Sequence, residues 1–158
     1  MGSFVFNVGK GRAVELYNRV KSNDPTNSAF IVVGLRRGVA TDATLKDYTT
    51  LQAVLNDANA DEVTGTGYAR KTLTDSDLAA FPGPDTTNDV YNIDLPDQTW
   101  TSVAAAAAWT DLLVCYDSDT STGTDANVIP VTCHDFAVTP DGSDIVAQIA
   151  ALGFFSAA

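Results

Sequence analysis

The most restrictive feature of the chain is the charge content of residues 72–158, which contain thirteen aspartates and no glutamate, lysine or arginine. Glutamate, lysine and arginine are good helix formers, whereas aspartate favours turns and helix caps. Threonine, which is also frequent in the chain, favours strands. This part of the protein is therefore expected to form short strands joined by many turns, not a helical bundle. With 158 residues in total, the protein has the length of one domain.

Several stretches have the pattern of β-strands. Residues 28–35 (SAFIVVGL) are a continuous apolar, β-branched run and predict a buried strand. Residues 64–74 alternate in the manner of a strand, and from Val90 onward VYNIDL, QTWTSV, WTDLLVCYD and NVIPVTCHDFAV follow at strand-like spacing. The turn residues of TPDGSD, at 139–144, predict a hairpin that joins FAV to IVAQIA.

Three stretches predict helices. Residues 10–21 place four apolar side chains at helical spacing: Ala13, Leu16, Tyr17 and Val20. Residues 41–57 repeat apolar side chains on one face and are the strongest helix prediction in the chain, and Thr44 with Asp47 resembles a capping pair. Residues 74–81 begin with a threonine cap and end before Pro82, which leaves room for two turns at most.

These elements predict an α+β fold that is mainly antiparallel β, a sandwich or barrel, with two or three short helices in the N-terminal half. We expect a single domain over residues 1–158, with a mixed-charge helical and strand part (about 1–72) and an acidic β-rich part (about 73–158). No apolar run approaches the ~20 residues that cross a bilayer. The charges of MGSFVFNVGKGR follow its apolar residues, the reverse of a signal peptide, so no membrane association is expected.

The charges of the chain are unevenly distributed. Residues 1–71 hold nine basic and seven acidic residues and have a net charge of +2. Residues 72–158 have a net charge of −13, which gives −11 for the whole chain. Nucleic-acid binding is not expected, because binding to phosphates depends on cationic side chains. One interpretation is a solvated acidic surface; the other is a molecule whose basic part binds a partner while its acidic part faces water. The partner-binding residues predicted by the second interpretation are Lys10, Arg12, Arg19, Lys21, Arg36 and Arg37.

VTCHDF, at 131–136, places Cys133, His134 and Asp135 side by side, the residue types of a cysteine hydrolase or a small metal site. Adjacent side chains of a strand point to opposite faces, so Cys133 and His134 are not expected to form a catalytic pair. The chain has no second histidine, and its two cysteines and one histidine are too few for a zinc site. We therefore predict no catalytic residue, no metal ligand and no cofactor. Cys115 and Cys133 are expected to be free buried thiols, with a disulfide between neighbouring strands as the alternative.

Residues 117–125 (DSDTSTGTD) partly resemble a calcium-binding loop. Thr122 and Val128 stand where an EF-hand requires glycine and glutamate, so a polar loop is the expected structure. A calcium site made by Asp117, Asp119 and Asp125 is the alternative.

The two tryptophans, Trp100 and Trp109, are expected to pack in the core; an exposed sugar-binding surface is the alternative. The glycines of NVGKGR and GTGYAR lack the spacing of phosphate-binding loops.

A resemblance to known proteins is carried by five stretches: GRAVELYNRVKSNDPTNSAFIVVGL, YARKTLTDSDLAA, TNDVYNIDLPDQTW, LLVCYD, and VIPVTCHDF through DGSDIVAQIAALGFF. They extend from about Gly11 to Phe155 and resemble small virion proteins of tailed bacteriophages, of the kind encoded among the head and capsid genes. None of these stretches is a catalytic signature.

The resemblance implies a non-enzymatic structural protein of the virion, with a capsid decoration (cement) protein on the outer shell of the head as the first interpretation. A neck, collar or tail-associated component is the second, and a carbohydrate- or receptor-binding β module is an alternative from another class. The implied partners are the major capsid protein or other virion proteins, with self-association into a homo-oligomer on the particle. In this interpretation the basic residues face an acidic capsid surface and the acidic β part faces solvent.

Overall fold

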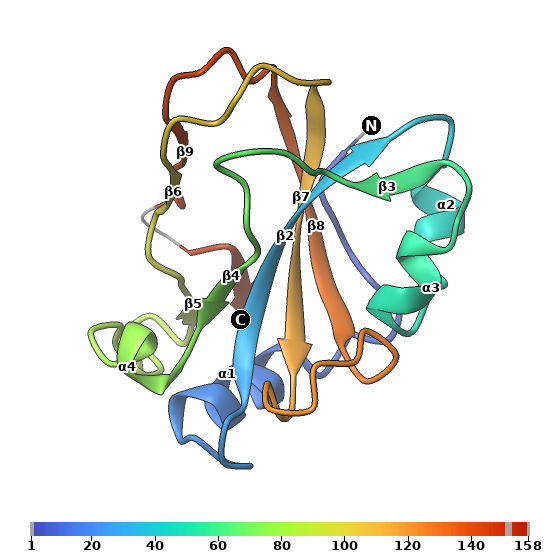
Figure 1. Ribbon diagram of the computed structural model, residues 1–158. Coiled ribbons are helices and arrows are strands. Elements are labelled where there is room, and N and C mark those ends of the chain that lie inside the picture. The colour runs from blue at the N-terminus through green and yellow to red at the C-terminus, as the bar shows by residue number, and fades with distance from the viewer. Residues whose placement is uncertain (1, 151–152, 158) are drawn as a thin grey trace.

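A central antiparallel sheet organises the molecule in the computed structural model, which describes residues 2–150 and 153–157 (Figure 1). Its strand order is β1–β8–β7–β2–β3, and β4 also pairs with β2. The six strands are β1 (Phe4–Val5), β2 (Ala29–Arg37), β3 (Ala60–Glu62), β4 (Lys71–Leu73), β7 (Trp109–Asp117) and β8 (Ile129–Val138). The predicted α+β, mainly antiparallel β fold is therefore confirmed, with open sheets in place of a closed barrel.

The strand predicted from SAFIVVGL forms the middle of this sheet. β2 pairs with β7 over seven residues, from Ala29 opposite Asp117 to Leu35 opposite Asp111. On its other edge β2 pairs with β4 near its start and with β3 near its end. Of the strand expected over residues 64–74, only Lys71–Leu73 pairs as a strand.

Two small sheets lie beside the central one. β5 (Tyr91–Ile93) pairs with β10 (Phe155–Ala157), and β6 (Gln98–Trp100) pairs with β9 (Ile145–Ala147). The hairpin predicted at TPDGSD is wrong, because β9 pairs with β6 and not with β8. Turn residues permit a reversal of the chain, but they do not determine which strand the chain meets afterwards. Here the turn is held by residues 102–103, where Gly142 donates to the Val103 carbonyl and Ser102 donates to the Asp144 carboxylate.

From residue 2 to the middle of the chain, the structure has four short helices, one more than expected: α1 (Ala13–Lys21), α2 (Asp42–Leu45), α3 (Leu51–Leu55) and α4 (Asp75–Leu78). The four apolar residues predicted for α1 are all buried. The long helix predicted over 41–57 is wrong, because the chain becomes extended again at Thr50 and starts a second helix there. Thr41 and Thr50 each accept a backbone N–H as N-caps, so Thr44 is the capped residue and not the cap.

The central sheet is covered on both faces. One face, with Ile31, Val33 and Leu35 of β2, packs against α2 and α3. The other face, with Phe30 and Val32, packs against α1 and the two small sheets, as Figure 1 shows on opposite sides of the central strands. The sheet takes strands from both the mixed-charge and the acidic parts of the chain, so these parts differ in charge but share one core. Among the described residues, no helix has the length and apolar character of a membrane span.

Candidate functional site

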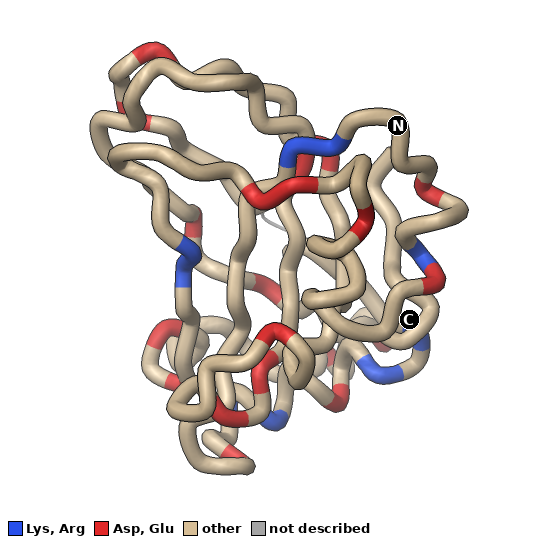
Figure 2. The backbone as a smooth tube through the Cα atoms, turned by 45° about the vertical axis from the view of Figure 1, so that its right-hand side comes forward, with Lys and Arg blue, Asp and Glu red and all other residues tan. Residues whose placement is uncertain are grey.

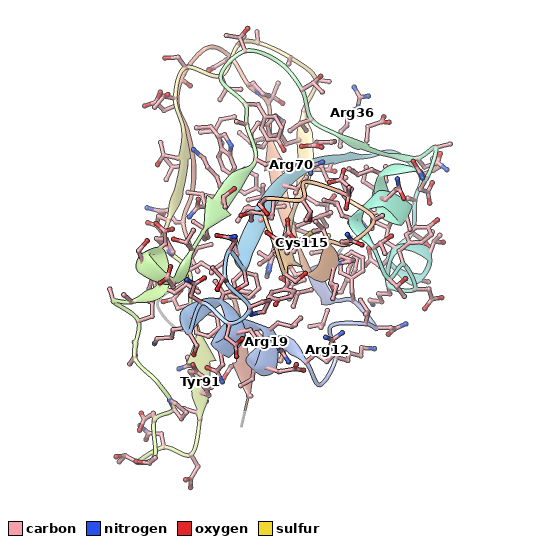
Figure 3. All side chains as sticks on the ribbon, turned by 60° about the horizontal axis from the view of Figure 1, so that its bottom comes forward. Arg12, Arg19, Arg36, Arg70, Tyr91 and Cys115 are labelled. Carbon is pink, nitrogen blue, oxygen red and sulfur yellow. The ribbon has the colours of Figure 1, made fainter. Side chains whose placement is uncertain are left out.

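The six basic residues predicted to bind a partner do not form one surface. Lys10, Arg12, Arg19 and Lys21 lie in or next to α1, at the end of the molecule where β2 begins. Arg36 and Arg37 lie at the other end of β2, roughly 26 Å away at the rise of a β-strand. Figure 2 shows segments with basic residues near the top and near the bottom of the molecule. Figure 3 shows Arg12 and Arg19 close together and Arg36 far from them.

The residues at the first end, Lys10, Arg12, Arg19 and Lys21, are called the α1 basic surface below. Arg12 and Arg19 both pair with Glu15, at 3.6 and 2.9 Å, and their side chains remain 42% and 45% exposed. The hydrogen bond from Arg19 lowers the pKa of Glu15. Two guanidinium groups therefore share one carboxylate, so these three side chains together carry a charge of +1, with Asp24 as a further carboxylate near Arg19.

The two lysines of this surface differ in exposure and in their hydrogen-bond acceptors. Lys10 is exposed and donates to the Asn7 side chain at 2.8 Å. Lys21 is half-buried and donates to the backbone carbonyls of Phe81 and Pro82, which ties α1 to the segment that follows α4. Lys21 adds its charge to the surface, but its ammonium group already has protein acceptors.

Arg37 is not a surface residue, and its prediction as a partner-binding residue is wrong. Its side chain is 0% exposed and forms two hydrogen bonds with Asp111, at 2.6 and 3.2 Å, and one with Asp42, at 2.5 Å. Asp111 is itself 1% exposed. In β2, residues 31, 33, 35 and 37 alternate onto the face that α2 and α3 cover, so Arg37 follows three apolar residues into the interior. It ties α2 to the sheet.

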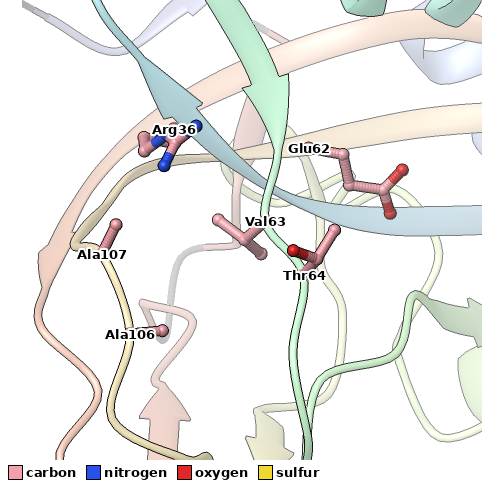
Figure 4. Close-up of a pocket in the computed structure, with 6 residues that line it drawn as sticks. All are labelled: Arg36, Glu62, Val63, Thr64, Ala106 and Ala107. Atoms are coloured by element: carbon pink, nitrogen blue, oxygen red, sulfur yellow. The ribbon is translucent and has the colours of Figure 1, made fainter.

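Arg36 points to the opposite side and is exposed, in an ion pair with Asp61 at 2.9 Å. It borders a small hollow of about 110 Å³, lined also by Glu62, Val63, Thr64, Ala106 and Ala107 (Figure 4). The Glu62 carboxylate is already bonded to Arg70 and Tyr68. This hollow therefore offers a ligand little polar chemistry.

Cys133 and His134 lie on opposite faces of β8, as the alternation predicts. Cys133 is buried with the residues under α2 and α3, where its thiol donates to the Asp111 carboxylate at 3.5 Å. His134 faces a cavity on the other side of the sheet. Burial raises the pKa of the thiols of both Cys133 and Cys115 well above the usual range, so both are protonated at neutral pH and are poor nucleophiles.

Both cysteines are free. Cys133 lies opposite Leu113 in the β7–β8 register, and Cys115 lies opposite Pro130. Neighbouring strands therefore carry the two thiols without placing them as direct cross-strand partners, which fits free thiols and not the alternative of a disulfide.

The loop between β7 and β8 uses its carboxylates in other interactions. Asp125 pairs with Arg70 at 2.5 and 2.9 Å, and Asp119 accepts hydrogen bonds from Ser121. Asp117 is buried and accepts from the backbone N–H of Asp119. Across residues 2–150 and 153–157, no three acidic, histidine or cysteine side chains are grouped as a metal site would require.

Trp100 and Trp109 are both buried and pack edge to face, with ring centroids 5.2 Å apart. The indole N–H of Trp100 donates to the Ala69 carbonyl at 2.7 Å. The carbohydrate-binding alternative predicted that one of these two tryptophans is exposed, so their burial counts against it.

Two structural ion-pair networks were missed by the sequence analysis. Arg37 with Asp111 forms one, and Arg70 with Glu62 and Asp125 forms the other. For Asp111, the alternation with Leu113 and Cys115 in WTDLLVCYD indicates a buried carboxylate, which requires a cation nearby. For Arg70, the sequence contains no comparable pattern, because its partners lie 8 and 55 residues away.

Comparisons of the chain with protein-family models, with curated proteins and with solved structures found no match. The functional interpretation therefore depends on the geometry and charge of the molecule.

Proposed function

We propose that the protein is a non-enzymatic structural component of a tailed-bacteriophage virion that binds the outer shell of the head as a capsid decoration protein. The observation that carries the proposal is the α1 basic surface, which gathers four of the nine basic residues at one end of a molecule with a net charge of −11. Attraction between this end and an acidic capsid surface orients the protein and speeds its encounter with the shell.

Binding to many identical patches of the shell at once would supply the affinity that a single contact lacks. An exposed ion pair contributes about 0–1 kcal/mol, so three or four of them give weak binding. A shell presents the same acidic patch many times, and a homo-oligomer of the decoration protein binds several patches together. Avidity then raises the occupancy without any new type of contact.

Binding to purified capsids tests the proposal. The variant carries Lys10→Gln, Arg12→Gln and Arg19→Gln, and the control for position is Arg36→Gln, which removes a single exposed arginine at the other end of β2. We expect the unmodified protein and Arg36→Gln to coat the head in many copies, with occupancy that falls as salt is raised. The triple variant should show low occupancy already at low salt.

Two results would contradict the proposal. Unchanged occupancy of the triple variant at low salt would exclude the α1 basic surface as the docking site. A copy number of roughly six or twelve, confined to one vertex as the symmetry of a neck or tail requires, would exclude decoration and support a neck, collar or tail position.

A further inference from the structure

β8 is covered by β1 on its outer edge over only part of its length. The strand runs over Ile129–Val138, and β7 pairs with its inner edge as far as Val138. On the outer edge, β1 pairs with Thr132 and Cys133. The chain before β1 then leaves this edge, because the Gly2 N–H donates to the Asp42 carboxylate of α2 at 3.2 Å. Within the described ranges, the last residues of β8 therefore have no neighbouring strand on their outer edge.

The backbone of Ala137 points to this open edge. The Val131 carbonyl accepts the Phe6 N–H at 2.9 Å, and the Asp135 N–H donates to the Ser3 hydroxyl at 3.1 Å. Residues 131 and 135 thus direct backbone groups to the outer edge, and alternation along the strand directs those of Ala137 the same way. Among residues 2–150 and 153–157, no hydrogen-bond partner reaches the N–H or the C=O of Ala137.

The open part of the edge, defined here as residues 136–139, has the chemistry of a strand that accepts another strand. Its sequence, FAVT, contains no charge and no proline, and aromatic and β-branched residues favour strands. Ala137 and Thr139 are exposed, whereas Phe136 and Val138 are partly buried against the core. An exposed strand edge without a charge, a proline or a cover is a template for pairing.

The opposite edge of the central sheet differs in charge. There β3 carries the exposed Asp61 at its middle residue, and β4 begins with Lys71. Two copies that paired through either strand would bring like charges together, which is unfavourable. In a molecule with a net charge of −11, the open part of the β8 edge lets a second copy approach without such a contact.

We propose that two copies of the protein pair through the open edge of β8, antiparallel and about a two-fold axis at Ala137, so that their central sheets become continuous. Each Ala137 N–H then donates to the Ala137 carbonyl of the second copy. Phe136 lies opposite Val138 of the second copy, and Asp135 lies opposite Thr139, so no like charges meet. Such an isologous contact uses the same strand of both copies and closes at a dimer.

The pairing leaves the α1 basic surface free. β2 begins near α1 and runs antiparallel to β7, so the end of β8 lies at the far end of the sheet (Figure 1). Self-pairing and capsid binding therefore use different surfaces, and either can fail without the other. Their salt dependences have opposite signs, because salt screens the attraction of α1 to an acidic shell but also screens the repulsion between two copies.

Sedimentation equilibrium of the full chain, at protein concentrations up to about 1 mM, tests the dimer. The open edge is shorter than a standard interface of ~800 Å² per partner, so we expect a dissociation constant of about 0.1–1 mM. This constant is measured at about 500 mM NaCl, and at about 50 mM NaCl we expect dimerisation at least about threefold weaker.

A substitution at the axis tests the position of the contact. Ala137→Pro removes the N–H on the outer edge, where an edge strand tolerates proline, and spares the ladder with β7. Dimerisation should weaken roughly tenfold or more, because both hydrogen bonds at the axis are lost. The matched control, Ala137→Val, keeps the N–H and should dimerise within about twofold of the unmodified protein.

Four results would overturn the proposal. The first is a monomer at every concentration and salt, and the second is a dimer that Ala137→Pro does not weaken. The third is growth beyond a dimer, which a closed two-fold contact does not allow. The fourth is a dimer that weakens as salt is raised, since that dependence indicates attraction between basic and acidic surfaces of two copies.

Amide hydrogen exchange of the unmodified protein keeps the proposal falsifiable if Ala137→Pro does not fold. At high salt, protection of the Ala137 N–H should rise at least about threefold as the protein concentration passes the dissociation constant. Amides of the exposed loop at 82–89 should not change. Protection of Ala137 that does not depend on protein concentration would contradict the pairing.

Discussion

Arg36 and Arg37 are adjacent in sequence, yet one is at the surface and the other is in the core. Arg36 is 51% exposed and pairs with Asp61, which is 57% exposed, whereas Arg37 is 0% exposed and pairs with the buried Asp111. An exposed pair is weakened by water and salt. A buried pair is different, because a charge that loses its partner there has no solvent to replace it.

Substituting each arginine by methionine should therefore have unequal effects. Arg37→Met leaves the Asp111 carboxylate buried without its cation, and we expect a loss of about 3–5 kcal/mol in the free energy of unfolding. Arg36→Met should cost about 0–1 kcal/mol. Urea unfolding of the two variants measures the difference.

A double variant separates the buried charge from lost packing. Arg37→Met with Asp111→Leu removes both charges, and it should recover a large part of the lost stability. If the double variant is as unstable as Arg37→Met alone, the penalty comes from packing and not from the unpaired carboxylate.

At the scale of helices and strands, local patterns predicted what an element is, but not what it pairs with. The apolar run at 28–35 predicted β2, and the spacing at 10–21 predicted α1, because burial of one face is encoded in the residues themselves. Residues 41–57 carry the same apolar periodicity, yet the Thr50 cap divides them into α2 and α3. The hairpin at 139–144 failed for a related reason, since the partner of β9 is β6, more than forty residues away.

The loop between β3 and β4 depends on such a distant contact at Gly67. Gly65 and Gly67 both have positive φ, at 128° and 88°. A Cβ at Gly67 would lie 2.8–2.9 Å from backbone atoms of residues 101–103, whereas a Cβ at Gly65 would meet nothing within 4 Å. The two positions therefore share the backbone constraint and differ only in packing.

Replacing each glycine by alanine separates the two costs. Gly65→Ala should lose about 1–2 kcal/mol through backbone strain alone. Gly67→Ala should lose a further ~1–3 kcal/mol, because the added methyl group meets backbone that cannot turn aside. Thermal or urea unfolding provides the comparison, and equal losses at the two positions would show that the contact with residues 101–103 yields easily.

At the scale of the whole molecule, the charge division and the fold are independent of each other. β2 and β7, one from each part of the chain, pair over seven residues in the middle of the sheet, so the acidic part is not a separate unit. The sequence itself contains the excess of acidic residues. That the six basic residues predicted to bind a partner lie at two ends of the molecule is visible only in the fold. The predicted docking surface is therefore limited to the α1 basic surface, and Arg36, at the other end of β2, is the position of the control substitution.

Stability should fall in two stages as the pH is lowered. His134 has its pKa lowered by burial, so the unfolded chain, with a pKa of ~6.5, binds the proton first, and stability is lost as the pH falls below that value. A second group of carboxyls has pKa values lowered by the hydrogen bonds they accept: Glu15, Asp42, Asp57, Asp85, Asp119 and Asp141. Their contribution is present above the unfolded pKa of ~4 and is lost as the pH falls through the folded values.

His134→Gln distinguishes the two stages. Urea unfolding between pH 7.5 and 3 should show that the variant loses the first stage and retains the second, because the carboxyls are untouched. Asp94, with its pKa raised by burial, acts in the opposite direction in both proteins and cancels in the comparison. If the variant loses stability between pH 6.5 and 5 as steeply as the unmodified protein, the acid sensitivity in that range belongs to the carboxyls and not to His134.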